Sequence, residues 1–71
     1  MEGLDFSAGW RLREPGVLEL PGTHYVIRWT GMGSHIVEWK DAPLGAAGSL
    51  NGAKEYAAHH ARSLLEMGLE P

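Results

Sequence analysis

The sequence predicts an α+β fold, in which an antiparallel β-meander of three or four strands packs on one C-terminal α-helix. Two apolar-alternating segments, Tyr25–Thr30 and His35–Trp39, flank a glycine-rich loop, as in a hairpin. A later segment repeats apolar residues at spacings of three and four, as in an amphipathic helix. Seventy-one residues leave room for one small domain. We divide it into a lead-in (1–9), the meander (10–40), a loop (41–48) and the helix (49–68).

The hairpin has the best-determined register of these elements. A three-residue loop, Gly31–Gly33, places the large apolar side chains of both strands on one face. A two-residue loop would scatter them, because a slip of one residue exchanges the faces of a strand. Gly33 then takes the left-handed position that such loops require. The predicted pairs are Thr30 with Ser34, Trp29 with His35, Ile27 with Val37, and Tyr25 with Trp39.

Two shorter strands are expected before the hairpin. Apolar and basic residues alternate from Trp10 to Arg13, and Val17–Leu20 reads as a second strand. A Pro-Gly pair follows each segment and marks a turn. The pairing of these strands stays open, because Pro15 fits poorly in a loop of the kind predicted for the hairpin.

The C-terminal part of the chain predicts a loop and then a helix. Residues 41–48 are mostly small and show no alternation, so we expect a loop there. Ser49 can cap a helix over Leu50–Met67, and Gly68 can end it. The apolar positions of this helix are Leu50, Ala53, Ala57, Ala61 and Leu64.

A helix face made of alanine methyl groups needs bulky side chains from the sheet, because protein interiors are densely packed. We expect Trp10, Tyr25, Trp29 and Trp39 to supply that bulk. Replacing Trp29 or Trp39 by alanine should then cost about 3 to 5 kcal/mol. His35 is expected at the boundary of this core, with its polar edge hydrogen-bonded.

Composition narrows the possible functions. The chain carries a net charge of -3 and no cysteine, which excludes disulfides and thiolate zinc sites. It has no apolar run of the ~20 residues that span a membrane, and its acidic start does not resemble a signal peptide, so we expect a cytoplasmic protein without membrane contact. We also expect no enzyme, cofactor or metal. The adjacent His59 and His60 would project about 100° apart on a helix, and no serine has an identifiable base and orienting group.

Four basic residues are predicted on the sheet face that points away from the helix: Arg11, Arg13, Arg28 and Lys40. A small sheet of this kind can enter the major groove of DNA. In the order of its elements, the chain from Trp10 to Met67 resembles the three-stranded DNA-binding domains of plant AP2 factors and of some phage integrase amino ends. That resemblance implies a DNA-binding module. The sheet departs from those strongly basic sheets at Glu14, Glu19 and Glu38.

We expect a protein-binding module as the first hypothesis, because so small a core cannot enclose a pocket of several hundred Å³. The candidate partner-binding residues are Val26, Met32 and Ile36, on the outer face and hairpin tip. As a compact, cysteine-free and glycine-rich single domain, the chain resembles accessory proteins of phages and mobile elements, including host-directed inhibitors. The first alternative is DNA binding through the basic face, and the second alternative is a homodimeric structural protein. A pull-down tests protein binding, a gel shift tests DNA binding, and sedimentation tests the homodimer.

Overall fold

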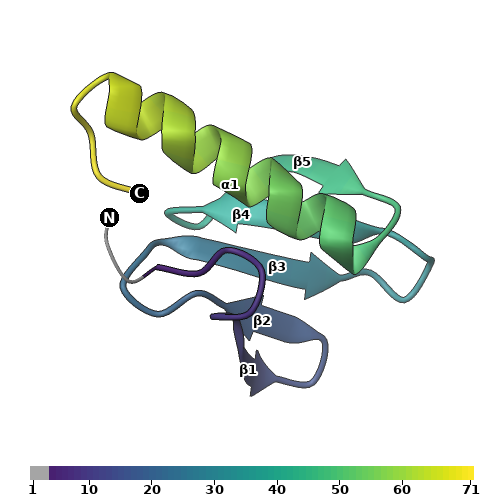
Figure 1. Cartoon of the computed structure of the whole chain (residues 1–71). Coiled ribbons are helices and arrows are strands. Elements are labelled where there is room, and N and C mark those ends of the chain that lie inside the picture. The colour runs from purple at the N-terminus through teal and green to yellow at the C-terminus, as the bar shows by residue number, and fades with distance from the viewer. Residues whose placement is uncertain (1–3) are drawn as a thin grey trace.

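The computed structural model describes residues 4–71 and shows one antiparallel sheet with a helix across one face (Figure 1). The sheet has five strands in the order β1-β2-β3-β4-β5, each paired with its neighbour in the sequence. The α+β class and the C-terminal helix are confirmed, but the sheet has five strands where the sequence predicts three or four. The elements are β1 (Arg11–Glu14), β2 (Val17–Glu19), β3 (Tyr25–Trp29), β4 (His35–Trp39), β5 (Ala42–Ala47) and α1 (Leu50–Glu66).

The central hairpin has the predicted register. β3 and β4 pair Tyr25 with Trp39, Ile27 with Val37 and Trp29 with His35, as predicted. The Thr30–Ser34 pair follows next to the loop. There the Thr30 amide donates a 3.0 Å hydrogen bond to the Ser34 carbonyl oxygen. Gly33 has a φ of 82°, in the left-handed region that favours glycine. The hydrophobic pattern therefore determined the pairing correctly.

The first two strands also form a hairpin, which settles the pairing that the sequence left open. β1 and β2 meet across a tight turn at Pro15–Gly16, where Gly16 has a φ of 77°. A type II turn requires positive φ at its third position, which glycine provides, and proline is common at its second position. The register shifts between Leu12 and Glu14, so a β-bulge lies directly before this turn.

The expected loop over residues 41–48 is wrong, because most of it forms β5. β5 pairs with β4 after a two-residue turn in which Lys40 and Asp41 both have positive φ, at 52° and 65°. Such turns usually carry Asn-Gly, so neither the turn nor the small, uncharged strand gave a recognisable signal. A second bulge, at Leu44, interrupts the ladder with β4.

The helix begins and ends as predicted, within one residue. The Ser49 hydroxyl accepts a 3.0 Å hydrogen bond from the Gly52 amide, and Gly68 ends the helix with a φ of 77°. One face of α1 packs on the sheet. The buried cluster of this interface consists of Ala53, Ala57 and Ala61 from α1, with Tyr25, Ile27 and Val37 from the sheet. Leu64 of α1 is buried as well.

The described part of the lead-in, residues 4–9, packs beside α1 over Tyr25. Phe6 meets the Tyr25 ring edge-on at 6.0 Å, and the Lys54 ammonium donates a 2.9 Å hydrogen bond to the Ser7 carbonyl oxygen. The Asp5 carboxylate accepts from the amides of Ser7 and Ala8, and these hydrogen bonds lower the pKa of Asp5. The segment is therefore a second cover on the helix side of the sheet.

Candidate functional site

The helix side of the sheet is only partly covered. α1 approaches β3, β4 and β5 but neither β1 nor β2, and Figure 1 shows the hairpin of β1 and β2 lying away from it. The segment over residues 4–9 covers the neighbourhood of Tyr25. Within residues 4–71, nothing beyond Leu50 at the start of α1 covers the end of the sheet where β1, β2 and the last residue of β3 meet.

An apolar groove of about 250 Å³ lies at this uncovered end. We call it the Leu12–Trp29 groove, after its two most exposed apolar side chains. Leu12 is 65% exposed and Trp29 is 58% exposed, so most of both side chains faces solvent. Among residues 4–71, no Asp, Glu, Lys or Arg lines the groove. Its lining residues are Leu12, Gly16, Val17, Leu18, Ile27, Trp29, His35 and Leu50.

The prediction that Trp29 belongs to the core is therefore wrong. Trp29 does lie on the same face as Tyr25 and Ile27, as the register requires. However, it is the last residue of β3, at the end of the sheet where α1 begins with Leu50. The helix consequently runs away from Trp29 and leaves its indole exposed. Alternation along a strand identifies the face of a residue, but only the helix position decides whether that face is covered.

Trp10 and Trp39 are part of the packed region, as predicted. Both are half-buried, and both indole N–H groups have carbonyl acceptors. Trp10 donates to the Phe6 carbonyl oxygen at 2.9 Å, and Trp39 donates to the Pro71 carbonyl oxygen at 2.6 Å. Trp29 is thus the one tryptophan whose indole N–H lacks an acceptor within residues 4–71.

His35 lies in the groove opposite Trp29. The expectation that its polar edge is hydrogen-bonded is not met, because Nδ1 is shielded from solvent and has no partner among the described residues. An unpaired buried polar atom of this kind costs about 1 to 3 kcal/mol. The groove therefore contains a buried polar atom without a hydrogen bond, unlike the interface under α1, where the Tyr25 hydroxyl is bonded to His60.

The predicted partner-binding residues occupy different environments. Met32 is 89% exposed at the tip of the central hairpin, as expected for a contact residue. Val26 and Ile36 lie on the outer face, opposite Glu38 and Arg28 respectively, but both are half-buried. Met32 is therefore the one of these three side chains that is mostly exposed.

The predicted basic residues likewise do not form a uniformly cationic face. The Arg28 guanidinium pairs with the Glu38 carboxylate at 3.0 Å, and Arg11 lies opposite Glu19. Arg13 falls at the bulge in β1. Lys40 lies in the turn after β4, where its ammonium is 4.7 Å from the centre of the Trp39 ring. Acidic side chains therefore lie among the basic ones on this side of the sheet.

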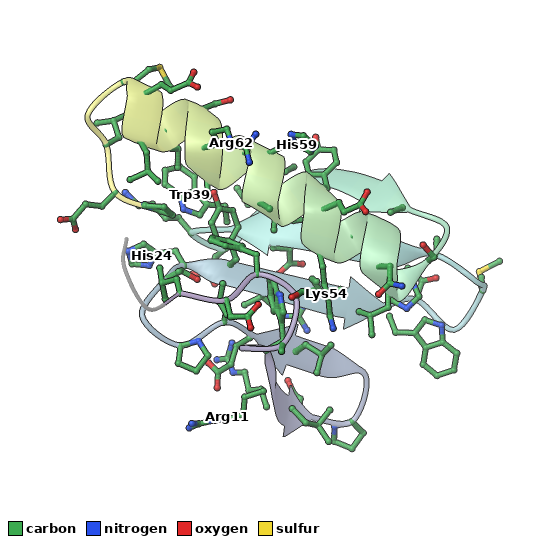
Figure 2. The ribbon with its side chains drawn as sticks, in the orientation of Figure 1. Arg11, His24, Trp39, Lys54, His59 and Arg62 are labelled. Carbon is green, nitrogen blue, oxygen red and sulfur yellow. The ribbon has the colours of Figure 1, made fainter. Side chains whose placement is uncertain are left out.

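A polar network joins α1 to the sheet near the middle of the molecule. The Tyr25 hydroxyl and His60 Nδ1 are 2.7 Å apart, and the His60 ring lies 5.3 Å from the Trp39 ring. Burial raises the pKa of Tyr25 to about 12. Figure 2 shows Trp39 under the C-terminal half of the helix and His59 on its outer side. No group of three His, Asp or Glu residues suited to holding a metal occurs within residues 4–71.

A wider and more polar hollow of about 820 Å³ separates residues 4–7 from the first turns of α1. Its lysine, Lys54, is already bonded to the Ser7 carbonyl oxygen. The hollow therefore lies between two segments that this hydrogen bond already joins. No helix in the described part of the chain is long and apolar enough to cross a membrane.

No protein-family model, curated protein or solved structure matches this chain. The geometry of the molecule is thus the only basis for assigning a function.

Proposed function

We propose that the protein is a small protein-binding module that uses the Leu12–Trp29 groove as its contact surface. The observation that carries the proposal is the exposure of Trp29, which stands on the apolar face of the sheet where only the first residue of α1, Leu50, lines the same groove. Contiguous exposed apolar side chains tend to mark interaction sites, and tryptophan is enriched among the residues that dominate binding energy.

The lining of the groove supports an apolar contact. Among residues 4–71, no Asp, Glu, Lys or Arg lines it, so a partner that fills it displaces water mainly from apolar surface. A volume of about 250 Å³ is below the usual range for small-molecule sites, which begins at about 300 Å³. A projecting side chain of another protein fits it better than a free metabolite does.

Affinity capture with matched variants tests this proposal. The wild type, Leu12→Ser and Trp29→Ser would each be immobilised and exposed to a lysate of the organism that makes the protein. Met67→Ser is the control, because Met67 is equally exposed, at 65%, at the far end of α1. We expect a partner that the wild type and the control retain and that both groove variants lose.

Equal capture by all four proteins would contradict the proposal, provided that their thermal melts agree. Capture that disappears in moderate salt and contains nucleic acid would instead favour the DNA-binding alternative. In that case Arg11→Ala and Arg28→Ala should weaken it, because these arginines lie on the opposite side of the sheet from the groove.

A further inference from the structure

The segment that follows α1, residues 67–71, turns back from the end of the helix toward the sheet (Figure 1). We call it the strap. Its first three amides donate to carbonyl oxygens near the end of α1, those of Ser63, Leu64 and Leu65. The direction in which the strap leaves the helix depends on Gly68, whose φ of 77° lies in the left-handed region.

Pro71 is the residue at which the strap meets the sheet. Its carbonyl oxygen accepts two hydrogen bonds, from the His24 amide at 3.1 Å and from the Trp39 indole N–H at 2.6 Å. Within residues 4–71, every hydrogen bond between the strap and the sheet ends on this one oxygen atom. Pro71 is buried, whereas residues 67–70 are exposed. The strap is therefore held to the sheet mainly at one residue.

The surroundings of Pro71 have the chemistry of a peptide-binding site. Extended proline-containing segments are bound by aromatic side chains, and their carbonyl oxygens are free because this conformation has no internal hydrogen bonds. Here an indole N–H and a backbone N–H converge on the carbonyl oxygen of a buried proline. A hollow of about 350 Å³ continues beside the contact, so a bound segment has room for further residues. The hollow is lined by Gly22, His24, Leu65, Glu70 and Pro71.

We propose that the His24 amide and the Trp39 indole form a binding site for a proline-containing peptide segment of another protein, and that the strap occupies this site as an intramolecular ligand. A partner segment that supplies the same carbonyl and also fills the hollow makes contacts that the strap lacks, so it can displace the strap. Because the partner binds only the open form, the strap weakens the apparent affinity by the fraction of molecules that are open.

This site is separate from the Leu12–Trp29 groove. Trp39 pairs with Tyr25 at one end of the central hairpin, whereas Trp29 pairs with His35 at the other end. The indole signals of Trp39 and Trp29 therefore report on the two sites independently.

Hydrogen exchange of the Trp39 indole N–H in a strap variant is the first test. Gly68→Val should release the strap, because a β-branched residue is strained at positive φ, and a Cβ there would have no atom within 4 Å to clash with. Gly48→Val is the control, since Gly48 is equally open and has no positive φ. We expect exchange at Trp39 to be at least about tenfold faster in Gly68→Val than in the wild type or the control, with Trp10 unchanged.

A synthetic peptide with the sequence of residues 67–71, Met-Gly-Leu-Glu-Pro, capped at both ends, is the second test. It should slow exchange at Trp39 in Gly68→Val and bind this variant at least about tenfold more tightly than the wild type. Pro71→Ala keeps the carbonyl but loses the proline ring, so its affinity for the peptide should lie between those two. Alanine in place of proline in the peptide should weaken binding several-fold.

Three results would overturn the proposal. The first is a Trp39 indole N–H that is as well protected in Gly68→Val as in the wild type, with native circular dichroism. The second is a peptide that binds Gly68→Val no more tightly than the wild type; if Gly68→Val does not fold, the same result with Pro71→Ala decides. The third is a peptide that shifts the indole signal of Trp29 and leaves that of Trp39 unchanged, which would assign it to the groove.

Discussion

Tyr25 is the residue on which the two layers of the molecule converge. It is fully buried, its ring contacts Phe6 edge-on, and its hydroxyl bonds to His60 on α1. Burial disfavours the phenolate form, which raises the pKa of Tyr25 from 10.0 to about 12. The residue therefore contributes a pH dependence to stability as well as packing.

Tyr25→Phe should make the protein less sensitive to alkali. In the wild type the unfolded chain loses the Tyr25 proton near pH 10, whereas the folded chain keeps it until about pH 12. Stability should thus be intact below pH 10 and fall by about 1.4 kcal/mol per pH unit between pH 10 and 12. Urea melts at pH 8 to 11 measure this. At pH 8 the free energy of unfolding of the variant should be about 1 kcal/mol lower than that of the wild type, because phenylalanine lacks the hydroxyl that bonds to His60. An identical alkaline slope in both proteins would contradict the assignment.

The turn between β4 and β5 contains backbone strain at Lys40 and Asp41, which both have positive φ. Residues with a Cβ are disfavoured in that region by about 1 kcal/mol or more, although aspartate tolerates it better than most. Asp41→Gly should therefore raise the free energy of unfolding by about 0.5 kcal/mol. Ala42→Gly, one residue later and without positive φ, should lower it. A chemical melt in which both changes destabilise the protein equally would refute the strain.

At the scale of elements, the ends of β3 and β4 differ in how much α1 covers them. Trp39 is half-buried beside His60 and bonded to the Pro71 carbonyl oxygen, whereas Trp29 is mostly exposed. Trp39→Ala should therefore cost about 3 kcal/mol, and Trp29→Ala about 1 kcal/mol or less. Thermal melts of the two variants measure the difference. Equal losses would place Trp29 in the core after all.

The contact between Gly45 and Tyr56 fixes β5 against α1. A methyl group at Gly45 would overlap the tyrosine ring, so Gly45→Ala should destabilise the fold by about 1 to 3 kcal/mol. In a Tyr56→Ala background the same change should cost much less, because the ring is gone. A double-mutant cycle by denaturant melting measures this coupling. Additive losses would show that the two residues do not share one contact.

The same elements show how far the sequence could predict the structure. The register of the central hairpin, the Ser49 cap and the Gly68 stop depend on local patterns, and these predictions are confirmed. β5 was missed because Ala42–Ala47 has small side chains without alternation, and because its turn uses Lys-Asp in place of a recognisable turn pair. A strand of this kind is stabilised by its neighbours β4 and α1, which local patterns do not reveal.

At the scale of the whole molecule, the Leu12–Trp29 groove is open because the sheet is wider than its cover. One helix spans β3 to β5, a short N-terminal segment covers the area of Tyr25, and the hairpin of β1 and β2 extends beyond both (Figure 1). The sequence could place Trp29 on the correct face but could not show where the helix begins relative to it. For this reason the contact surface that we propose lies on the helix side of the sheet, whereas the sequence predicts one on the outer face.

The central claim, that Trp29 is an open contact residue, is tested most directly by hydrogen exchange of the three indole N–H groups, followed by NMR. In the free protein the signals of Trp10 and Trp39 should be protected by their carbonyl acceptors, and that of Trp29 should exchange with solvent at once. Adding the captured partner should slow exchange at Trp29 alone. An indole at Trp29 that is already protected in the free protein, or unchanged when the partner binds, would contradict the account.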